Sequence, residues 1–337
     1  MPTPATGYHL AFSQLSQEVS DRIRKLTWIK SQGPEIFKFI ARVIGFAFSF
    51  WIFSIDTIFT KIAGMLTMCY FFFGIAITGV HEARHGTFVK SEKINKLFGY
   101  LFSDFWAGQS SEWWYDTHVL IHHPDTNIPT LNPPSFYFPW INRYIYFFIA
   151  PFFAIFWINI SSGIYLWGKW RKLIAFTLCC VAGWIAQVAL FSIALPWGYA
   201  IIATYILRSL FAPIFMHLAI FNHVGLETPE IRLPWLEHQL KTTRNIKKNW
   251  FLTGMGGSAF VECHTEHHLF PNINNHLLKK IRPIVEEYAK KINLPYFEET
   301  YFNVLKEAIR DYDQAFNLTS PIKSQSLGYQ EQQSKQP

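Results

Sequence analysis

The chain has 337 residues, of which 50% are hydrophobic and 18% aromatic, which excludes an ordinary soluble globule and is typical of an integral membrane protein. The formal net charge is +7, but the cations cluster beside apolar segments, where lysine and arginine mark the cytoplasmic face, so no nucleic acid partner is indicated. Three of the four cysteines lie inside apolar runs, which argues against a disulfide framework.

The N-terminal part predicts a cytoplasmic segment followed by a helical hairpin. Residues 1–35 are polar, end in a basic stretch and lack the layout of a cleaved signal peptide. Segments 36–54 and 62–80 are apolar and long enough to cross about 30 Å of hydrocarbon. Residues 56–61 predict the turn between them, so the second helix returns to the cytoplasmic side.

The next turn of that helix carries the first of three histidine clusters. His81 and His85 are four residues apart, a spacing at which one helical turn presents two imidazoles to a common ion. Segment 90–114 mixes tryptophans with polar residues, which indicates either a membrane interface or an amphipathic helix packed on the cytoplasmic cap. It leads to the second cluster, which repeats the four-residue spacing and consists of His118, His122 and His123.

Three apolar segments follow, and only two of them are expected to span. If all metal ligands meet on one side of the membrane, the number of crossings between the second and third clusters must be even. Segment 144–167 is the weakest candidate, because it contains Pro151 and several polar residues and precedes a basic group. We therefore expect it to lie in the interface or re-enter, whereas 173–195 and 198–221 form a second hairpin.

The last spanning helix contains ionisable residues and ends at a candidate ligand. Arg208 fits snorkelling or pairing within the bundle, and His217 is predicted to pack rather than to bind metal. His223 lies where the helix emerges and is a candidate ninth ligand, with Asn222 as a candidate supporting residue. The alternative for His223 is an interfacial histidine that anchors the helix end.

The third cluster contains His264, His267 and His268, which a helix would place on one face. Residues 226–263 before it are polar with basic spots, and the apolar spacing over 275–313 predicts amphipathic helices that cover the metal cap. Residues 317–337 are rich in Ser and Gln and predict a disordered tail. One membrane domain, 36–316, accounts for the rest.

Eight histidines in three clusters exceed the needs of one ion, because zinc sites usually take four ligands and mononuclear iron sites often take two histidines and a carboxylate. The sequence therefore predicts two metal ions in one site. The alternative, scattered surface histidines, does not explain why the clusters gather beside helix ends on one predicted side. Glu82 and Glu266, inside the clusters, are expected either to hydrogen-bond ligand imidazoles or to be solvated charges.

These motifs resemble the three histidine boxes of the membrane-bound fatty acid desaturases over roughly residues 36–310. The sequence around 242–251 and the run His-His-Leu-Phe-Pro at 267–271 are most similar to the front-end acyl desaturases. Two departures stand out. Those enzymes often carry glutamine at the position of His264, and a fused cytochrome b5 domain, which many of them carry, is absent from this sequence.

The resemblance implies an all-α fold in which four spanning helices lie under a cytoplasmic cap that holds two irons, with the acyl chain in a tunnel. It implies O2-dependent insertion of a double bond into an acyl lipid, acyl-CoA or acyl-carrier substrate. Electrons would come from an external donor of the ferredoxin or cytochrome b5 type. The expected location is a bacterial inner membrane or the endoplasmic reticulum, with both termini and the metal site cytoplasmic.

Two rival functions remain open from the sequence. A membrane di-iron hydroxylase or ketolase, acting on an alkane, sterol or carotenoid, would use the same ligand set to insert oxygen. A metal transporter without redox chemistry would instead carry histidines within its spanning helices and at both faces.

Overall fold

The computed structural model describes residues 4–132 and 141–319 of the chain. The elements in chain order are α1 Pro4–Arg24, α2 Trp28–Ser31, α3 Gly33–Ser54, α4 Ile58–Arg84, α5 Glu92–Tyr100, the π-helix η1 Leu101–Ala107, α6 Ser111–Trp114, the π-helix η2 Tyr115–His122, α7 His123–Asp125, α8 Arg143–Phe148, the 3-10 helix η3 Ala150–Phe153, α9 Ala154–Leu166, α10 Trp170–Ser192, α11 Trp197–Ser209, α12 Ala212–Phe221, α13 Trp235–Thr242, β1 Arg244–Ile246, α14 Trp250–Gly256, the 3-10 helix η4 Ser258–Phe260, α15 His264–Leu269, α16 Asn275–Lys291, β2 Phe297–Glu299 and α17 Tyr301–Thr319. The fold is helical, apart from β1 and β2, which pair in parallel.

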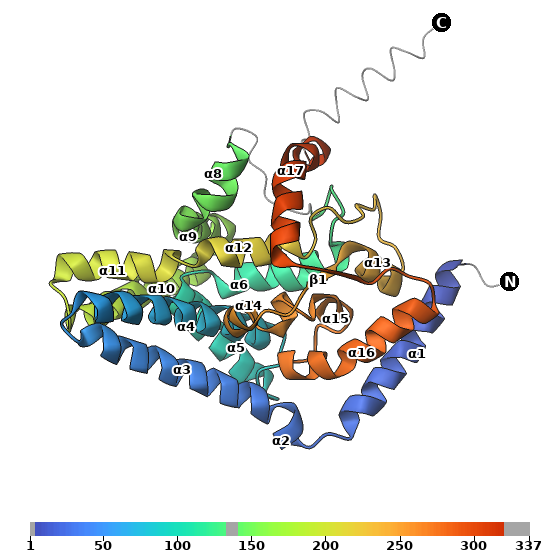
Figure 1. The fold of residues 1–337 in the computed structure, drawn as a ribbon, viewed down its shortest axis with the longest axis horizontal. Coiled ribbons are helices and arrows are strands. Elements are labelled where there is room, and N and C mark those ends of the chain that lie inside the picture. The colour runs from blue at the N-terminus through green and yellow to red at the C-terminus, as the bar shows by residue number, and fades with distance from the viewer. Residues whose placement is uncertain (1–3, 133–140, 320–337) are drawn as a thin grey trace, which may run out of the picture.

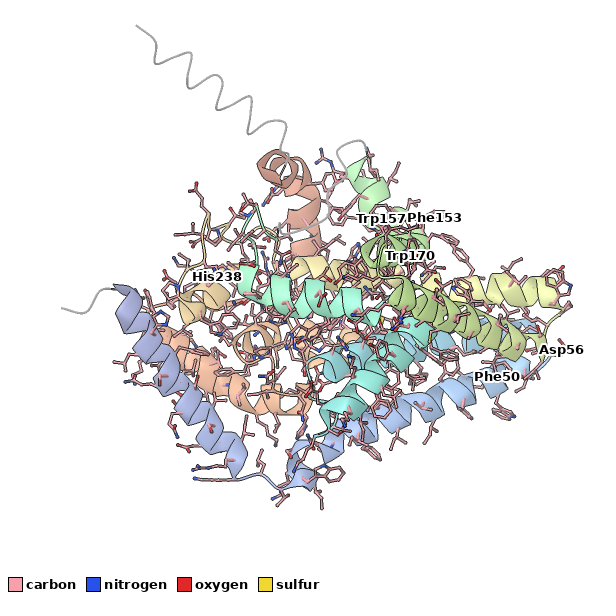
Figure 2. The ribbon with its side chains drawn as sticks, turned by 180° about the vertical axis from the view of Figure 1, so that it is seen from behind. Phe50, Asp56, Phe153, Trp157, Trp170 and His238 are labelled. Carbon is pink, nitrogen blue, oxygen red and sulfur yellow. The ribbon has the colours of Figure 1, made fainter. Side chains whose placement is uncertain are left out.

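Within residues 4–132 and 141–319, four helices are long and apolar enough to cross a membrane, which matches the predicted number. They are α3, α4, α10 and the continuous stretch Trp197–Phe221, and they extend together to one side of the molecule (Figure 1). The last stretch is divided into α11 and α12 because Pro213, near the start of α12, has no N–H to continue the hydrogen-bond ladder. Asp56, between α3 and α4, lies at the far end from His238 (Figure 2).

Segment 144–167 contains no helix long enough to span, as the sequence predicts. It is divided into α8, η3 and α9, with Pro151 at the start of η3, and the longest continuous apolar piece is Ala150–Leu166. Phe153 and Trp157 at the start of this apolar piece are exposed, and so are Trp167 and Trp170 after its end, whose ring centroids lie 4.9 Å apart. Exposed aromatic rings of this kind are typical of a membrane interface.

Arg208 of α11 is buried and joins three elements. Its Nε donates to Gln187 Oε1 at 2.7 Å, and its Nη1 donates to the carbonyl of Ala107 at 3.2 Å. The guanidinium also lies 4.2 Å from the ring centroid of Trp184. These contacts tie α11 to α10 and to the end of η1, so pairing within the bundle, one of the two expected roles, is the one observed.

The same junction gives a stability prediction at Gly183 of α10. A Cβ atom on Gly183 would lie 1.8 Å from the carbonyl oxygen of Phe105 in η1, so backbone must move to accept it. We expect Gly183→Ala to lower the free energy of unfolding by about 1–3 kcal/mol. Thermal melting in detergent measures this, and Gly198→Ala is the control, because a Cβ at Gly198 meets nothing within 4 Å. Equal melting temperatures for the two variants would contradict the close approach.

The opposite end of the molecule is a cap built from α1, α13, α15 and α16 (Figure 1). Its apolar core includes Leu15 and Val19 from α1, Leu236 from α13 and Leu278 from α16. The amphipathic helices predicted within 275–313 are α16 and the first part of α17, with β2 between them. Of the predicted disordered tail, 317–319 form the end of α17, and 320–337 lie outside the described residues.

Candidate metal centre

The nine candidate histidines come from four separate parts of the chain and meet between the spanning helices and the cap. The first cluster lies at the end of α4, the second in η2 and α7, and the third in α15, while His223 follows the last turn of α12. Seven of the nine side chains are buried and two are half-buried. The structure therefore brings together all of the histidines that the sequence nominated.

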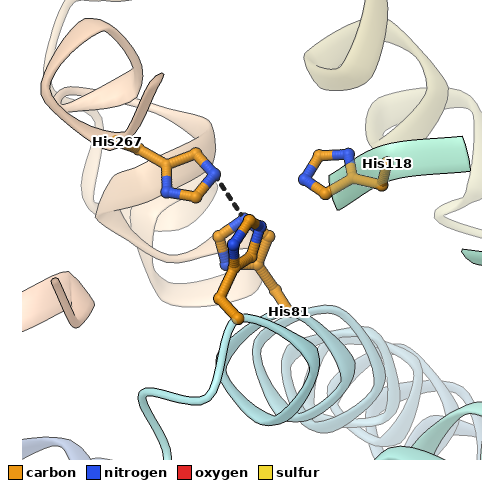
Figure 3. Close-up of side chains that lie close together, drawn as sticks. His81, His118 and His267 are labelled. Carbon is orange, nitrogen blue, oxygen red and sulfur yellow. Dashed lines mark hydrogen bonds between the residues drawn. The ribbon is translucent and has the colours of Figure 1, made fainter. Parts of the chain in front are cut away.

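The histidines form two groups of four, and within each group one nitrogen per ring lies within 4.8 Å of the others. The first group is His81, His85, His118 and His267. The second group is His122, His223, His264 and His268. Figure 3 shows three members of the first group approaching from three directions, with His81 Nε2 and His267 Nε2 at 2.9 Å.

The expected pairing of His118 and His122 on one ion does not hold in the structure. The two residues lie about one turn apart in η2, and their rings stack with centroids 5.2 Å apart, so they point to the same side of the helix at different levels. At its level the ring of His122 meets those of His223 and His268, with centroids 4.6 and 4.9 Å away. His118 therefore enters the first group and His122 the second. In α15 the histidines also divide, with His267 in the first group and the other two in the second.

His123 belongs to neither group and lies between them. Its ring centroid is 4.7 Å from that of His267 and 4.3 Å from that of His268. Both of its ring nitrogens are buried without a hydrogen-bond partner among the described residues. It is therefore placed to complete the ligand set of either group.

The protonation of two rings in the second group shows that a cation fits there. His223 Nδ1 lies 3.0 Å from the carbonyl of Thr242, and His264 Nδ1 lies 2.7 Å from the carbonyl of Ala259. A carbonyl only accepts, so both Nδ1 atoms carry the proton. Burial lowers the pKa of His264 to about 3 and that of His223 well below its usual range, so both rings are neutral.

The two Nε2 atoms of His223 and His264 therefore both carry lone pairs, and they face each other at 2.8 Å. Two acceptors at that distance repel, unless a cation binds both. Burial likewise lowers the pKa of His85 in the first group to about 3 and that of His122 in the second to about 4. Neutral imidazoles in these numbers suit iron and other transition metals.

Removing bound metal is expected to destabilise the protein, because the converging lone pairs are then left unpaired in a buried site. A metal bound at a thousand times its Kd stabilises a fold by about 4 kcal/mol, so we expect chelation to lower the melting temperature by about 5–10 °C. Differential scanning fluorimetry before and after chelation measures the shift. Full recovery on adding metal back is the control, and an unchanged melting temperature would contradict the assignment.

Glu82 and Glu266 are buried, so they are not the solvated charges of one expectation, and among the described residues their hydrogen bonds go to groups other than the candidate histidines. Glu82 accepts from Thr87 Oγ1 at 2.5 Å and from the backbone N–H of Asn275 at 2.9 Å. Glu266 accepts from Tyr296 Oη at 2.6 Å and from Asn245 Nδ2 at 3.0 Å. On a helix the residue after or before a ligand points about 100° away from it, so these carboxylates anchor the ligand helices to their neighbours instead.

The remaining predicted residues also contact the backbone. The Asn222 side chain donates to the carbonyls of Leu218 and Phe260 and touches no ligand imidazole. His217 packs as predicted, with Nδ1 2.6 Å from Tyr301 Oη and Nε2 2.9 Å from the carbonyl of Phe147. The groups that do hold ligand rings, including Gln239 and Asn132, carry no motif and become visible only when the chain is folded.

An apolar cavity of about 80 Å³ adjoins the first group. It lies between α4, α9 and α12, and its apolar lining is interrupted by the polar side chains of Gln109 and Arg208. Trp114 and Phe260 form the wall toward the metal site, with ring centroids 4.3 Å from His118 and 4.8 Å from His81, respectively. A hydrocarbon chain in this cavity would contact the rings that separate it from the first group.

Comparison with known proteins shows the family of the chain. Residues 58–300 match the family model described as fatty acid desaturase. The chain is 26% identical to human fatty acid desaturase 6, over 94% of this chain and 91% of the relative. It is 26% identical to the sn-1 linoleoyl-lipid 6-desaturase of Arthrospira platensis, over 77% and 79%, and 23% identical to the Delta(5) fatty acid desaturase fat-4 of Caenorhabditis elegans, over 72% and 61%. No solved structure matches the chain. With most of the chain matched to one family, and with three histidine boxes gathered at the ends of apolar helices, the protein belongs to the fatty acid desaturase family.

Proposed function

We propose that this integral membrane oxidoreductase inserts a double bond into an acyl chain, with its two histidine groups holding two iron ions. The two groups of four imidazoles, with lone pairs converging beside an apolar cavity, are the observation that carries the proposal. Bound iron would supply the dioxygen activation that an unactivated methylene pair requires and that no side chain provides. Because His223 falls within the second group of four, His123, which lies between the groups, replaces it as our candidate for the ninth ligand.

The chain's own residues bind and orient the substrate. The cavity is lined by side chains such as Phe72, Ile77 and Ile155, which accept a hydrocarbon segment and exclude water from it. Trp114 and Phe260 lie against both the cavity and the first group, so they would fix how closely a methylene approaches the metal side. Holding the reacting carbons at one distance in this way is how the protein would favour one double-bond position.

We further propose that the metal site faces the cytoplasm. Basic residues precede α3, and a basic group at 169–172 lies at the start of α10. Both lie at the ends of these helices that are nearer the cap. Lysine and arginine are enriched on that side of a membrane. An external donor of the ferredoxin or cytochrome b5 type would then deliver electrons from the cytoplasm.

Heterologous expression followed by gas chromatography of fatty acid methyl esters tests the function. We expect a new unsaturated acyl species that is absent from cells with an empty vector, and mass spectrometry of derivatised esters then locates the double bond. An oxygenated lipid in its place would identify a hydroxylase or ketolase. Bound, exchangeable zinc without oxygen consumption would identify a metal-binding protein without redox chemistry.

A further inference from the structure

Gln239 of α13 is fully buried and connects two histidine clusters that lie far apart in the sequence. Its Oε1 lies 3.0 Å from Nδ1 of His268 in the third cluster. Its Nε2 donates to the backbone carbonyl of His123 in the second cluster at 2.8 Å. One side chain therefore fixes both a ligand ring and the backbone that follows η2.

These two contacts determine the protonation of His268. The His123 carbonyl only accepts, so the amide nitrogen of Gln239 must face it and the amide oxygen must face His268. The proton between Oε1 and the ring must then be on Nδ1, which leaves the lone pair on Nε2. His268 Nε2 is buried without a hydrogen-bond partner among the described residues, as a nitrogen reserved for metal would be. The Thr126 hydroxyl, at 3.4 Å from Nδ1, is a longer contact and does not alter this result.

The two groups differ in how many of their Nδ1 atoms have a hydrogen-bond partner. In the second group, Nδ1 of three rings faces an acceptor, namely the Thr242 carbonyl for His223, the Ala259 carbonyl for His264 and Gln239 Oε1 for His268. Nδ1 of His122 instead faces a donor, the side-chain amide nitrogen of Asn132 at 2.8 Å. In the first group, both nitrogens of His85 and Nδ1 of His267 have no hydrogen-bond partner among the described residues. Gln239 and Thr126 both contact His268 Nδ1 and the backbone of the second cluster, and the Gln239 contact with Nδ1 is the shorter, at 3.0 Å against 3.4 Å.

We infer that Gln239 is a positioning residue for the metal ion of the second group, because it holds His268 in the Nδ1–H form and joins α13 to the second cluster. The inference rests on the proposed metal pair but not on the identity of the lipid substrate. Outer residues that orient metal-binding histidines typically contribute 10–100-fold to affinity. The loss of Gln239 should therefore weaken one metal position and leave the other unchanged.

Titration of the metal-free, full-length protein in detergent with Co²⁺ tests this, with binding followed by cobalt absorption. We expect two binding steps in the wild type, and in Gln239→Leu one step weakened about 10–100-fold with the other within about twofold. His238→Leu is the matched control, because His238 is equally buried on the same helix and belongs to neither group, so both steps should persist. Equal weakening of both steps in Gln239→Leu, no weakening, or the same loss in His238→Leu would overturn the inference.

A second variant and a direct measurement cover the case in which Gln239→Leu does not fold. Gln239→Glu keeps an acceptor for His268 Nδ1–H, so it should retain the second metal more tightly than the leucine variant, and a glutamate variant that binds only one ion would overturn the inference. In the wild type, ¹⁵N chemical shifts of the imidazoles in the metal-free protein should show His268 protonated at Nδ1, and protonation at Nε2 would also overturn it. No readout uses turnover, so an inactive lipid assay leaves these results interpretable.

Discussion

His264→Ala and His85→Ala are each expected to reduce desaturation to less than about a hundredth of the wild-type rate. His85 belongs to the first group and His264 to the second, so each substitution removes one of four imidazoles from one metal position. Even residues that only orient a ligand typically contribute 10–100-fold to metal affinity or activity, so loss of a ligand should reach at least the upper end of that range. Iron per chain and acyl products in the same preparation measure the effect.

The two variants should differ in which group they empty, while both remain inserted in the membrane. Gel filtration in detergent checks that the protein is monodisperse, and His276→Ala is the control, because His276 is half-buried on α16 and outside both groups. We expect the control to keep two irons and most of the activity. Wild-type activity in either ligand variant would remove that residue from the site.

Filling the cavity is the second large expected effect. Ala76 of α4 is buried and lines the cavity, so the ring in Ala76→Phe would occupy space that the acyl chain needs. We expect turnover of long acyl chains to fall at least about tenfold. Crowding by the new ring should make the reactive position of the acyl chain less favourable, and about 1.4 kcal/mol is already enough to slow the reaction tenfold. Shorter chains should lose less, and the iron content should be unchanged. Acyl product profiles across a series of chain lengths measure the effect.

Ala63→Phe is the matched control for Ala76→Phe. Ala63 lies on the same helix but is exposed, so its substitution adds the same ring outside the cavity. We expect its product profile to equal that of the wild type. If the two variants had the same activity, or if Ala76→Phe also lost iron, the cavity would not be the acyl site.

Much of the architecture follows from local properties of the chain. Four apolar segments of sufficient length, and one interrupted by Pro151, predict four spans and one segment that does not cross. Hydrocarbon burial and backbone hydrogen bonding act over a few turns of helix, so they can be evaluated along the sequence. The histidine clusters were likewise recognisable by spacing, because residues three or four apart along the chain lie on one face of a helix.

The spacing of the histidines along the chain did not predict how the imidazoles divide between the two groups. A four-residue separation places two rings on one side of a helix, but the stacked rings of His118 and His122 meet different partners, so they enter different groups. From the sequence, Glu82 and Glu266 were either partners of the imidazoles or solvated charges, whereas in the structure both are buried against neighbouring elements, and no motif indicated Gln239. The residue types and the number of spanning helices were thus fixed locally. The packing of η2, α13 and α15 against one another decided which nitrogens meet, because those contacts join residues that lie far apart along the chain.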